Sequence, residues 1–208
     1  MFMRLFVSLT LMLSISCAKV GTSLSQPNLS MSNQNQKIEK KYDKVVSLEI
    51  EDNLNNTLSM GIKKFYKLFY LKDKKEYKKF VEENACLNKV IYKKFLGKDT
   101  RKNCVPLKVI KEKDVDIYRK LIEAYMSAKY FIDNIKSIFQ EKGIKLNVKV
   151  KIEKNEDKNI YGKQQVSYSG EKKEEIKWAK FIVPYQVEEN KIYYDFLFGG
   201  VDKKWKKC

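Results

Sequence analysis

The absence of histidine limits the catalytic chemistry that this sequence can support. Ser-His-Asp and Cys-His catalysis, histidine-ligated zinc and imidazole proton relays all require that residue. Neither common spacing of a glycine-rich phosphate loop is present. The acidic cluster of Glu153, Glu156 and Asp157 falls in a predicted turn, where solvated carboxylates are ordinary. We therefore predict a protein that is not an enzyme and has no cofactor.

Cys17 is the cysteine whose position predicts a covalent modification. Arg4 and the uncharged apolar segment 5–15 precede it, and this segment is shorter than the ~20 residues of a membrane-spanning helix. Ser16, a small residue directly before Cys17, resembles the lipobox of bacterial lipoprotein signal peptides. This resemblance implies that residues 1–16 are a cleaved signal peptide and that the Cys17 thiol carries diacylglycerol. The alternative is an ordinary secretory signal peptide with a cysteine near its cleavage site.

The segment after Cys17 differs sharply from the rest of the chain. Residues 17–40 are rich in serine, asparagine and glutamine and show no apolar period. Such a segment buries too little apolar surface to offset its chain entropy, so we predict a disordered tether that carries the lipid on its first residue. Residues 41–208 are predicted to form a single α+β domain, and none of its segments has the apolar length of a membrane span.

The composition is strongly basic, with a net charge of +17 from 43 basic and 26 acidic residues, and all but three of the basic residues are lysine. Lipobox, polar tether and a domain rich in Lys, Ile, Asn and Tyr together resemble the plasmid-encoded surface lipoproteins of Lyme-disease-type spirochaetes. This resemblance implies an outer-membrane anchor, at the cell surface or alternatively on the periplasmic side, and contact with host or vector molecules. It transfers no ligand-binding residue. The positive field favours anionic partners, but we expect no nucleic acid for an exported protein.

Three further cysteines remain after Cys17. Cys86 and Cys104 are 18 residues apart on either side of a predicted loop, and export favours their pairing as a disulfide. Closing a loop of that size contributes about 3 kcal/mol on the chain-entropy model. The alternative is two buried free thiols. Cys208 is left as a free thiol, an intermolecular bridge or a competing partner, and without histidine these cysteines make no plausible metal site.

Apolar residues recur at helical spacing through the first half of the domain. The predicted helices are 53–71, 74–86, 87–96 and 114–142. Asp73 and Asp114 are predicted N-caps, and Gly97 and Gly143 are predicted to end helices. The region 97–109 is predicted to be a loop.

The helix 114–142 is the clearest element and is expected to be the central pillar of the core. Its apolar stripe consists of Tyr118, Leu121, Tyr125, Ala128, Ile132, Ile135 and Phe139. Ile117, Phe131 and Ile138 widen the stripe, which favours packing within a globular domain over a two-helix coiled-coil dimer.

The apolar period then changes from 3.6 to 2, which predicts strands at 144–153, 160–169, 176–187 and 191–198. The first alternates apolar residues with lysine and is predicted to be half-buried with a solvated lysine face. Short polar connections predict an antiparallel meander. Pro184 predicts an edge strand or a bulge, and 44–51 is predicted as an additional strand. The fold class is α+β, with N-terminal helices, one of them long, packed on a C-terminal antiparallel β-meander of about four strands.

Two lysine clusters could bind anionic groups. One is the C-terminal run Lys203, Lys204, Trp205, Lys206 and Lys207, and the other comprises Lys98, Arg101 and Lys102 in the predicted loop. Lysine beside tryptophan suits a sulfated polysaccharide, a phospholipid headgroup or an acidic protein surface. The alternative is a solvated C-terminus with Trp205 packed on the sheet, because lysine is abundant throughout the chain.

These observations predict a surface-exposed, lipid-anchored protein without catalytic activity. Its membrane contact is the N-terminal lipid, and its expected partner is a host or vector protein or a sulfated polysaccharide. The second hypothesis is a structural envelope lipoprotein that faces the periplasm. An enzyme of unrecognised type is third.

Overall fold

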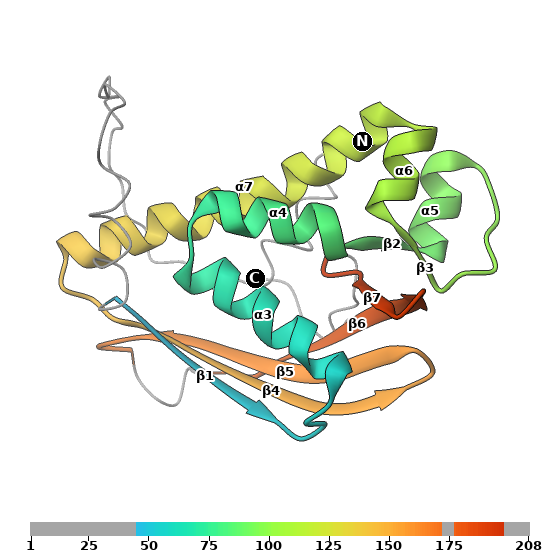
Figure 1. Ribbon diagram of the computed structural model, residues 1–208. Helices are drawn as coiled ribbons and strands as arrows, with labels where there is room; N and C mark the ends of the chain where they lie inside the picture. The colour runs from blue at the N-terminus through green and yellow to red at the C-terminus, as the bar shows by residue number, and fades with distance from the viewer. Residues whose placement is uncertain (1–44, 172–176, 198–208) are drawn as a thin grey trace.

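The computed structural model describes residues 45–171 and 177–197, which fold into five helices and seven strands (Figure 1). Five helices and the main sheet share one hydrophobic core. The predicted signal peptide, the tether with Cys17, the run Lys203–Lys207 with Trp205, and Cys208 lie outside the described residues.

The main sheet has five strands in the order β1-β4-β5-β6-β7. These strands are β1 Val46–Asp52, β4 Leu146–Glu156, β5 Asn159–Tyr168, β6 Ala179–Glu188 and β7 Lys191–Tyr194. Strands β4 to β7 pair antiparallel in chain order, as the predicted meander requires. Strand β1 pairs parallel with β4, from Val46 opposite Leu146 to Asp52 opposite Ile152. All five helices of the described residues lie in the connection between these two strands, because parallel neighbours need a long crossover.

Pro184 lies in an interior strand, so the edge position predicted for it is wrong. The β5–β6 pairing ends with Asn159 opposite Pro184, and the β6–β7 pairing begins with Tyr185 opposite Tyr194. The Pro184 carbonyl accepts a hydrogen bond from the Asp195 N–H at 2.8 Å. The proline therefore occupies the point where β6 changes partner, and its missing N–H removes no ladder bond.

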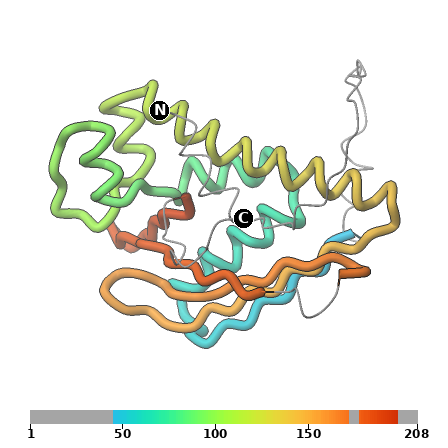
Figure 2. The backbone as a smooth tube through the Cα atoms, turned by 180° about the vertical axis from the view of Figure 1, so that it is seen from behind, coloured from blue at the N-terminus to red at the C-terminus, as the bar shows by residue number. Residues whose placement is uncertain are grey.

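Helices α3 Thr57–Leu71, α4 Lys74–Asn84 and α7 Val115–Glu141 cover one face of the sheet, and no described helix lies on the other face (Figures 1 and 2). The predicted N-caps are correct, since the Asp73 and Asp114 side chains accept the N–H groups of the first turns of α4 and α7. Helix α4 ends at Asn84, two residues before the predicted end.

Helix α3 begins four residues later than predicted because a polar turn precedes it. The Asp52 carboxylate accepts hydrogen bonds from the Leu54 and Asn55 N–H groups and forms an ion pair with Lys63 at 2.7 Å. Burial raises the pKa of Asp52, but the hydrogen bonds from Lys63, Ser59 and the backbone outweigh it and lower the pKa to about 2. The Asn56 side chain then caps α3.

Helix α7 buries Leu121, Tyr125, Ile132 and Ile135 of the predicted apolar stripe, but the stripe is widened on the side opposite to the predicted one. Phe131 and Ile138, expected to widen the buried stripe, are 44% and 49% exposed. Lys129 and Lys136 are buried in their place, beside Tyr125 and Ile132. Long lysine stems fill apolar space as a hydrocarbon would, so the apolar pattern alone did not identify these two positions as buried.

The two buried lysines share one carboxylate. Asp133 Oδ1 lies 2.7 Å from Lys129 Nζ and 3.0 Å from Lys136 Nζ. Lys136 Nζ also donates to the Tyr70 carbonyl, which lies in the last turn of α3, at 2.9 Å. Burial and the charge of Lys136 lower the pKa of Lys129 to about 8, against the opposing effect of Asp133. Lys136 thus links α7 to α3, whereas Lys129 adds a second positive charge to the same buried site.

We expect Lys129→Met to raise the free energy of unfolding at pH 7 by on the order of 2–3 kcal/mol. The folded-state pKa of Lys129, about 8, lies below its ordinary value of 10.5. The folded state therefore binds fewer protons than the unfolded state between these values, and wild-type stability rises with pH there. The free energy of unfolding of Lys129→Met should not show this rise with pH. Urea denaturation at pH 7 and pH 9.5 measures both effects, with exposed Lys67→Met as control. A Lys129→Met protein less stable than wild type at pH 7 would contradict this account.

Candidate functional site

The segment Cys86–Lys113 forms a small unit at the N-terminal end of α7, which we call the basic knob (Figure 1, right). It comprises β2 Cys86–Asn88, α5 Lys89–Leu96, β3 Cys104–Pro106 and α6 Leu107–Lys113. The predicted helix 87–96 begins only at Lys89, and its predicted end at Gly97 is correct, with Gly97 in the left-handed conformation. The predicted loop 97–109 is wrong in its second half, which contains β3 and the start of α6.

A disulfide joins the two strands of the basic knob. Cys86 and Cys104 are bonded, with their Cα atoms 5.6 Å apart, and this is the pair favoured by the sequence. Strands β2 and β3 pair antiparallel, with Asn88 opposite Cys104 and Cys86 opposite Pro106. Both cysteines are buried against Tyr193 of β7. The disulfide thus cross-links the knob at its base, where the knob meets the main sheet.

The buried carboxylate of Asp195 ties β2 to the residues after β7. Its Oδ2 accepts hydrogen bonds from the Asn88 backbone N–H at 2.9 Å and from Asn88 Nδ2 at 2.7 Å, and its Oδ1 accepts from the Leu197 N–H at 3.1 Å. Asn88 Oδ1 in turn caps α5 by accepting the Val90 and Ile91 N–H groups. One carboxylate therefore orients Asn88, and Asn88 orients α5.

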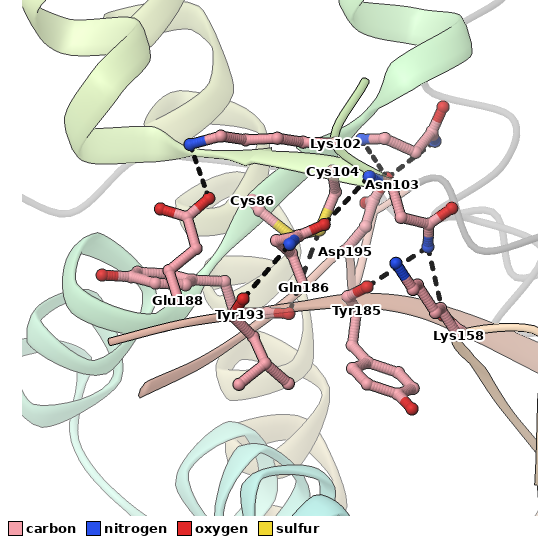
Figure 3. The surroundings of a disulfide bond; sticks show 12 residues. Cys86, Lys102, Asn103, Cys104, Lys158, Tyr185, Gln186, Glu188, Tyr193 and Asp195 are labelled. Carbon is pink, nitrogen blue, oxygen red and sulfur yellow. Dashed lines mark hydrogen bonds and ion pairs between the residues drawn. A yellow bond between two sulfur atoms is a disulfide. The ribbon is translucent and has the colours of Figure 1, made fainter. Parts of the chain in front are cut away.

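Residues beside Cys104 anchor the knob to β6 (Figure 3). The Asn103 N–H donates to Gln186 Oε1 at 3.0 Å, and Asn103 Nδ2 donates to the carbonyls of Lys158 and Tyr185 at 3.1 and 3.2 Å. Lys102 Nζ lies 2.7 Å from Glu188 Oε1. The knob is held to the sheet on both of its strands.

The basic knob carries nine basic residues and only two acidic ones. The basic residues are Lys89, Lys93, Lys94, Lys98, Arg101, Lys102, Lys108, Lys111 and Lys113. Lys93 pairs with Asp99 within the knob and Lys102 pairs with Glu188. The other seven form no ion pair with a carboxylate in the part of the chain that the structure describes. Seven of the nine positive charges of the knob are therefore not neutralised by an ion pair with a described residue.

Each of the three lysines of α6 lies over the ring of a tyrosine from a different element. Nζ-to-centroid distances are 5.5 Å for Lys108 over Tyr193, 5.4 Å for Lys111 over Tyr118 and 5.9 Å for Lys113 over Tyr92. Lys113 Nζ also lies 3.3 Å from the Tyr92 hydroxyl. A tyrosine ring attracts an ammonium group but leaves its full charge available, unlike a carboxylate.

The lysines on the open face of the sheet are arranged differently. Parallel pairing of β1 with β4 places Glu49 opposite Lys149 and Glu51 opposite Lys151, with ion pairs of 3.2 and 2.5 Å. Lys163 pairs with Glu153 at 2.8 Å. The predicted solvated lysine face of residues 144–153 is thus an ion-paired face. Sequence alone did not show this, because it depends on the partner of β1.

Of the predicted anion-binding residues, Lys98, Arg101 and Lys102 lie in the basic knob, and the C-terminal run lies outside the described residues. Sequence reasoning missed Lys108, Lys111 and Lys113. A signal for α6 was present, because Leu107 and Ile110 follow Pro106 at helical spacing and both are buried.

The described residues contain no group of three or more cysteines or carboxylates placed to hold a metal ion. None of the described helices combines the length and apolar character needed to cross a bilayer. Comparisons with protein-family models, curated proteins and solved structures find no match to this chain.

We expect Asp195→Asn to lower the free energy of unfolding by about 3 kcal/mol. The carboxylate oxygens face three N–H donors, so either orientation of the amide would place an NH₂ group against a donor. Chemical denaturation measures the loss. Asp99→Asn, in an exposed ion pair, is the matched control and should cost less than 1 kcal/mol. Equal losses in the two variants would show that Asp195 does not hold the knob.

Proposed function

We propose that this chain is a lipid-anchored, non-enzymatic surface protein whose basic knob binds an anionic macromolecule of the host or vector. A sulfated polysaccharide is the partner whose chemistry fits best. The observation that carries this proposal is the set of seven basic residues in the knob without a carboxylate partner among the described residues. Their charge is available to a ligand without breaking an existing ion pair.

Rigidity of the knob supports the same function. The disulfide, the Asp195 hydrogen bonds and the Asn103 contacts fix its backbone before any partner binds. Tyrosine rings restrict the α6 lysines in the free protein. Side chains that are already ordered lose less entropy on binding, so such a surface binds more tightly than equally charged flexible lysines.

The position of the knob relative to the chain entry also supports this proposal. The Val45 carbonyl accepts a hydrogen bond from the Leu146 N–H, just beyond the C-terminal end of α7, whereas the knob contacts its N-terminal end (Figure 1). Helix α7 has 27 residues and so a length of about 40 Å. With the lipid on Cys17, the chain enters the domain at one end and presents the knob at the other.

A second candidate function is favoured by the exposed apolar residues Tyr130, Phe131 and Ile138 on α7. Such a patch would suit a dimeric structural lipoprotein facing the periplasm. Protease treatment of intact cells separates the two functions. Loss of the domain supports surface exposure, and protection of the domain supports the periplasmic alternative.

We expect replacement of four knob lysines by glutamine, at Lys89, Lys94, Lys98 and Lys111, to weaken binding to heparin about tenfold at 0.1 M salt. Each exposed charge contact contributes a few tenths of a kcal/mol. The matched control replaces Lys67, Lys75, Lys79 and Lys145, which are also exposed. This control should lower the affinity for heparin about threefold or less. A third set, Lys203, Lys204, Lys206 and Lys207, tests the C-terminal run. Isothermal titration measures all three. Equal losses from all sets would mean attraction by net charge without a site.

We expect Cys17→Ala to abolish lipidation and detergent-phase partitioning, since its thiol is the proposed lipid acceptor. Labelling with a radioactive fatty acid and phase separation in a non-ionic detergent measure this. Cys208→Ala is the control and should partition like wild type. A Cys17→Ala protein that still partitions into detergent would refute the lipid anchor.

A further inference from the structure

Two lysines from distant parts of the sequence converge on one tyrosine ring at the base of the knob. Lys108 is in α6 and Lys191 begins β7, and the Nζ of each lies 5.5 Å from the centroid of the Tyr193 ring. Their ammonium groups are therefore no farther apart than twice that distance. Both lysine side chains are exposed, so this pair of charges is accessible to a ligand.

The tyrosine between them is fixed in place. Tyr193 is only 2% exposed and pairs with Gln186 across β6 and β7. Its backbone carbonyl lies 3.9 Å from Cys104 Sγ, so the main chain at Tyr193 contacts the disulfide (Figure 3). The backbone of this tyrosine is thus fixed by strand pairing and by the disulfide contact, and its ring restricts the two lysine side chains that lie over it.

Carboxylates act on this pair only from a distance. Neither Lys108 nor Lys191 forms an ion pair among the residues that the structure describes, and the nearest acidic residue of β6, Glu188, is engaged by Lys102 at 2.7 Å. A hydrogen bond with the Tyr193 hydroxyl, with smaller effects of Glu189 and Glu188, raises the pKa of Lys108. Lys108 thus stays positively charged at neutral pH.

We propose that Lys108 and Lys191, which both lie over the buried Tyr193 ring, form a subsite for one sulfate or phosphate monoester group of the anionic partner. The two ammonium groups lie close enough for their flexible ends to approach one oxyanion from two sides, and each would then form a charge-assisted hydrogen bond with it. This inference rests on the proposed function of the knob and names the residues that bind an individual anionic group.

The test measures binding of a heparin-derived octasaccharide and of vesicles containing phosphatidic acid, which present sulfate and phosphate esters respectively. Lys108→Gln, Lys191→Gln and the double variant are compared with wild type. The matched control is Lys94→Gln with Lys111→Gln, which removes the same charge from the same knob. Unchanged melting temperatures show that the variants are folded, since all four side chains are exposed.

We expect the double variant to lose at least about tenfold in affinity and the control pair about threefold or less. Each single variant should lose nearly as much as the double, because a bridged anion needs both lysines. If the octasaccharide shows these losses, the subsite binds a sulfate ester, and if the vesicles show them, it binds a phosphate ester. Wild-type binding with equal losses in both pairs would overturn the subsite and leave the proposed function intact. If the wild-type protein binds neither the octasaccharide nor the vesicles, both the subsite and the proposed function are overturned.

Discussion

The buried carboxylate of Asp195 is the interaction on which the basic knob depends. A carboxylate without water must be compensated by several donors, and here Asn88 and Leu197 supply three. This places the start of α5 against the end of the sheet. The disulfide then fixes β3 beside β2, and α6 follows directly from β3. The positions of Lys108, Lys111 and Lys113 are thus set by contacts made at the base of the knob.

Lysine is abundant throughout the chain, and the fold sorts it into three environments. On the open face of the sheet, parallel pairing of β1 with β4 brings glutamates opposite lysines and neutralises them. In the core, Lys129 and Lys136 share Asp133 and fill space between helices. In the basic knob, tyrosine rings hold lysines without neutralising them. Net charge alone would not distinguish these three environments. The groups that contact each lysine, carboxylates or tyrosine rings, distinguish them.

Local patterns predicted much of the fold. Strict alternation identified β4, and capping residues located the starts of α4 and α7, because these signals act within a few residues. The partner of β1 could not be predicted, since parallel pairing across about a hundred residues leaves no local mark. Strands β2 and β3 have three residues each, too few for a period. The centre of the buried stripe of α7 was predicted correctly, but its edge was not, because lysine was counted as polar at positions where its stem is buried. The candidate site was found only in part, since the tyrosines that hold the α6 lysines come from three separate elements.

The central claim is that the knob lysines, and not the net charge, contact an anionic partner. Lysines labelled with carbon-13 methyl groups keep their charge and give one resolved signal each in an NMR spectrum. Titration with a heparin octasaccharide should shift the signals of Lys108, Lys111, Lys113 and Lys191 first, and they should saturate together. The ion-paired lysines Lys149, Lys151 and Lys163 should shift little until the ligand is in excess. Simultaneous shifts of equal size on the sheet face and the knob would contradict the account.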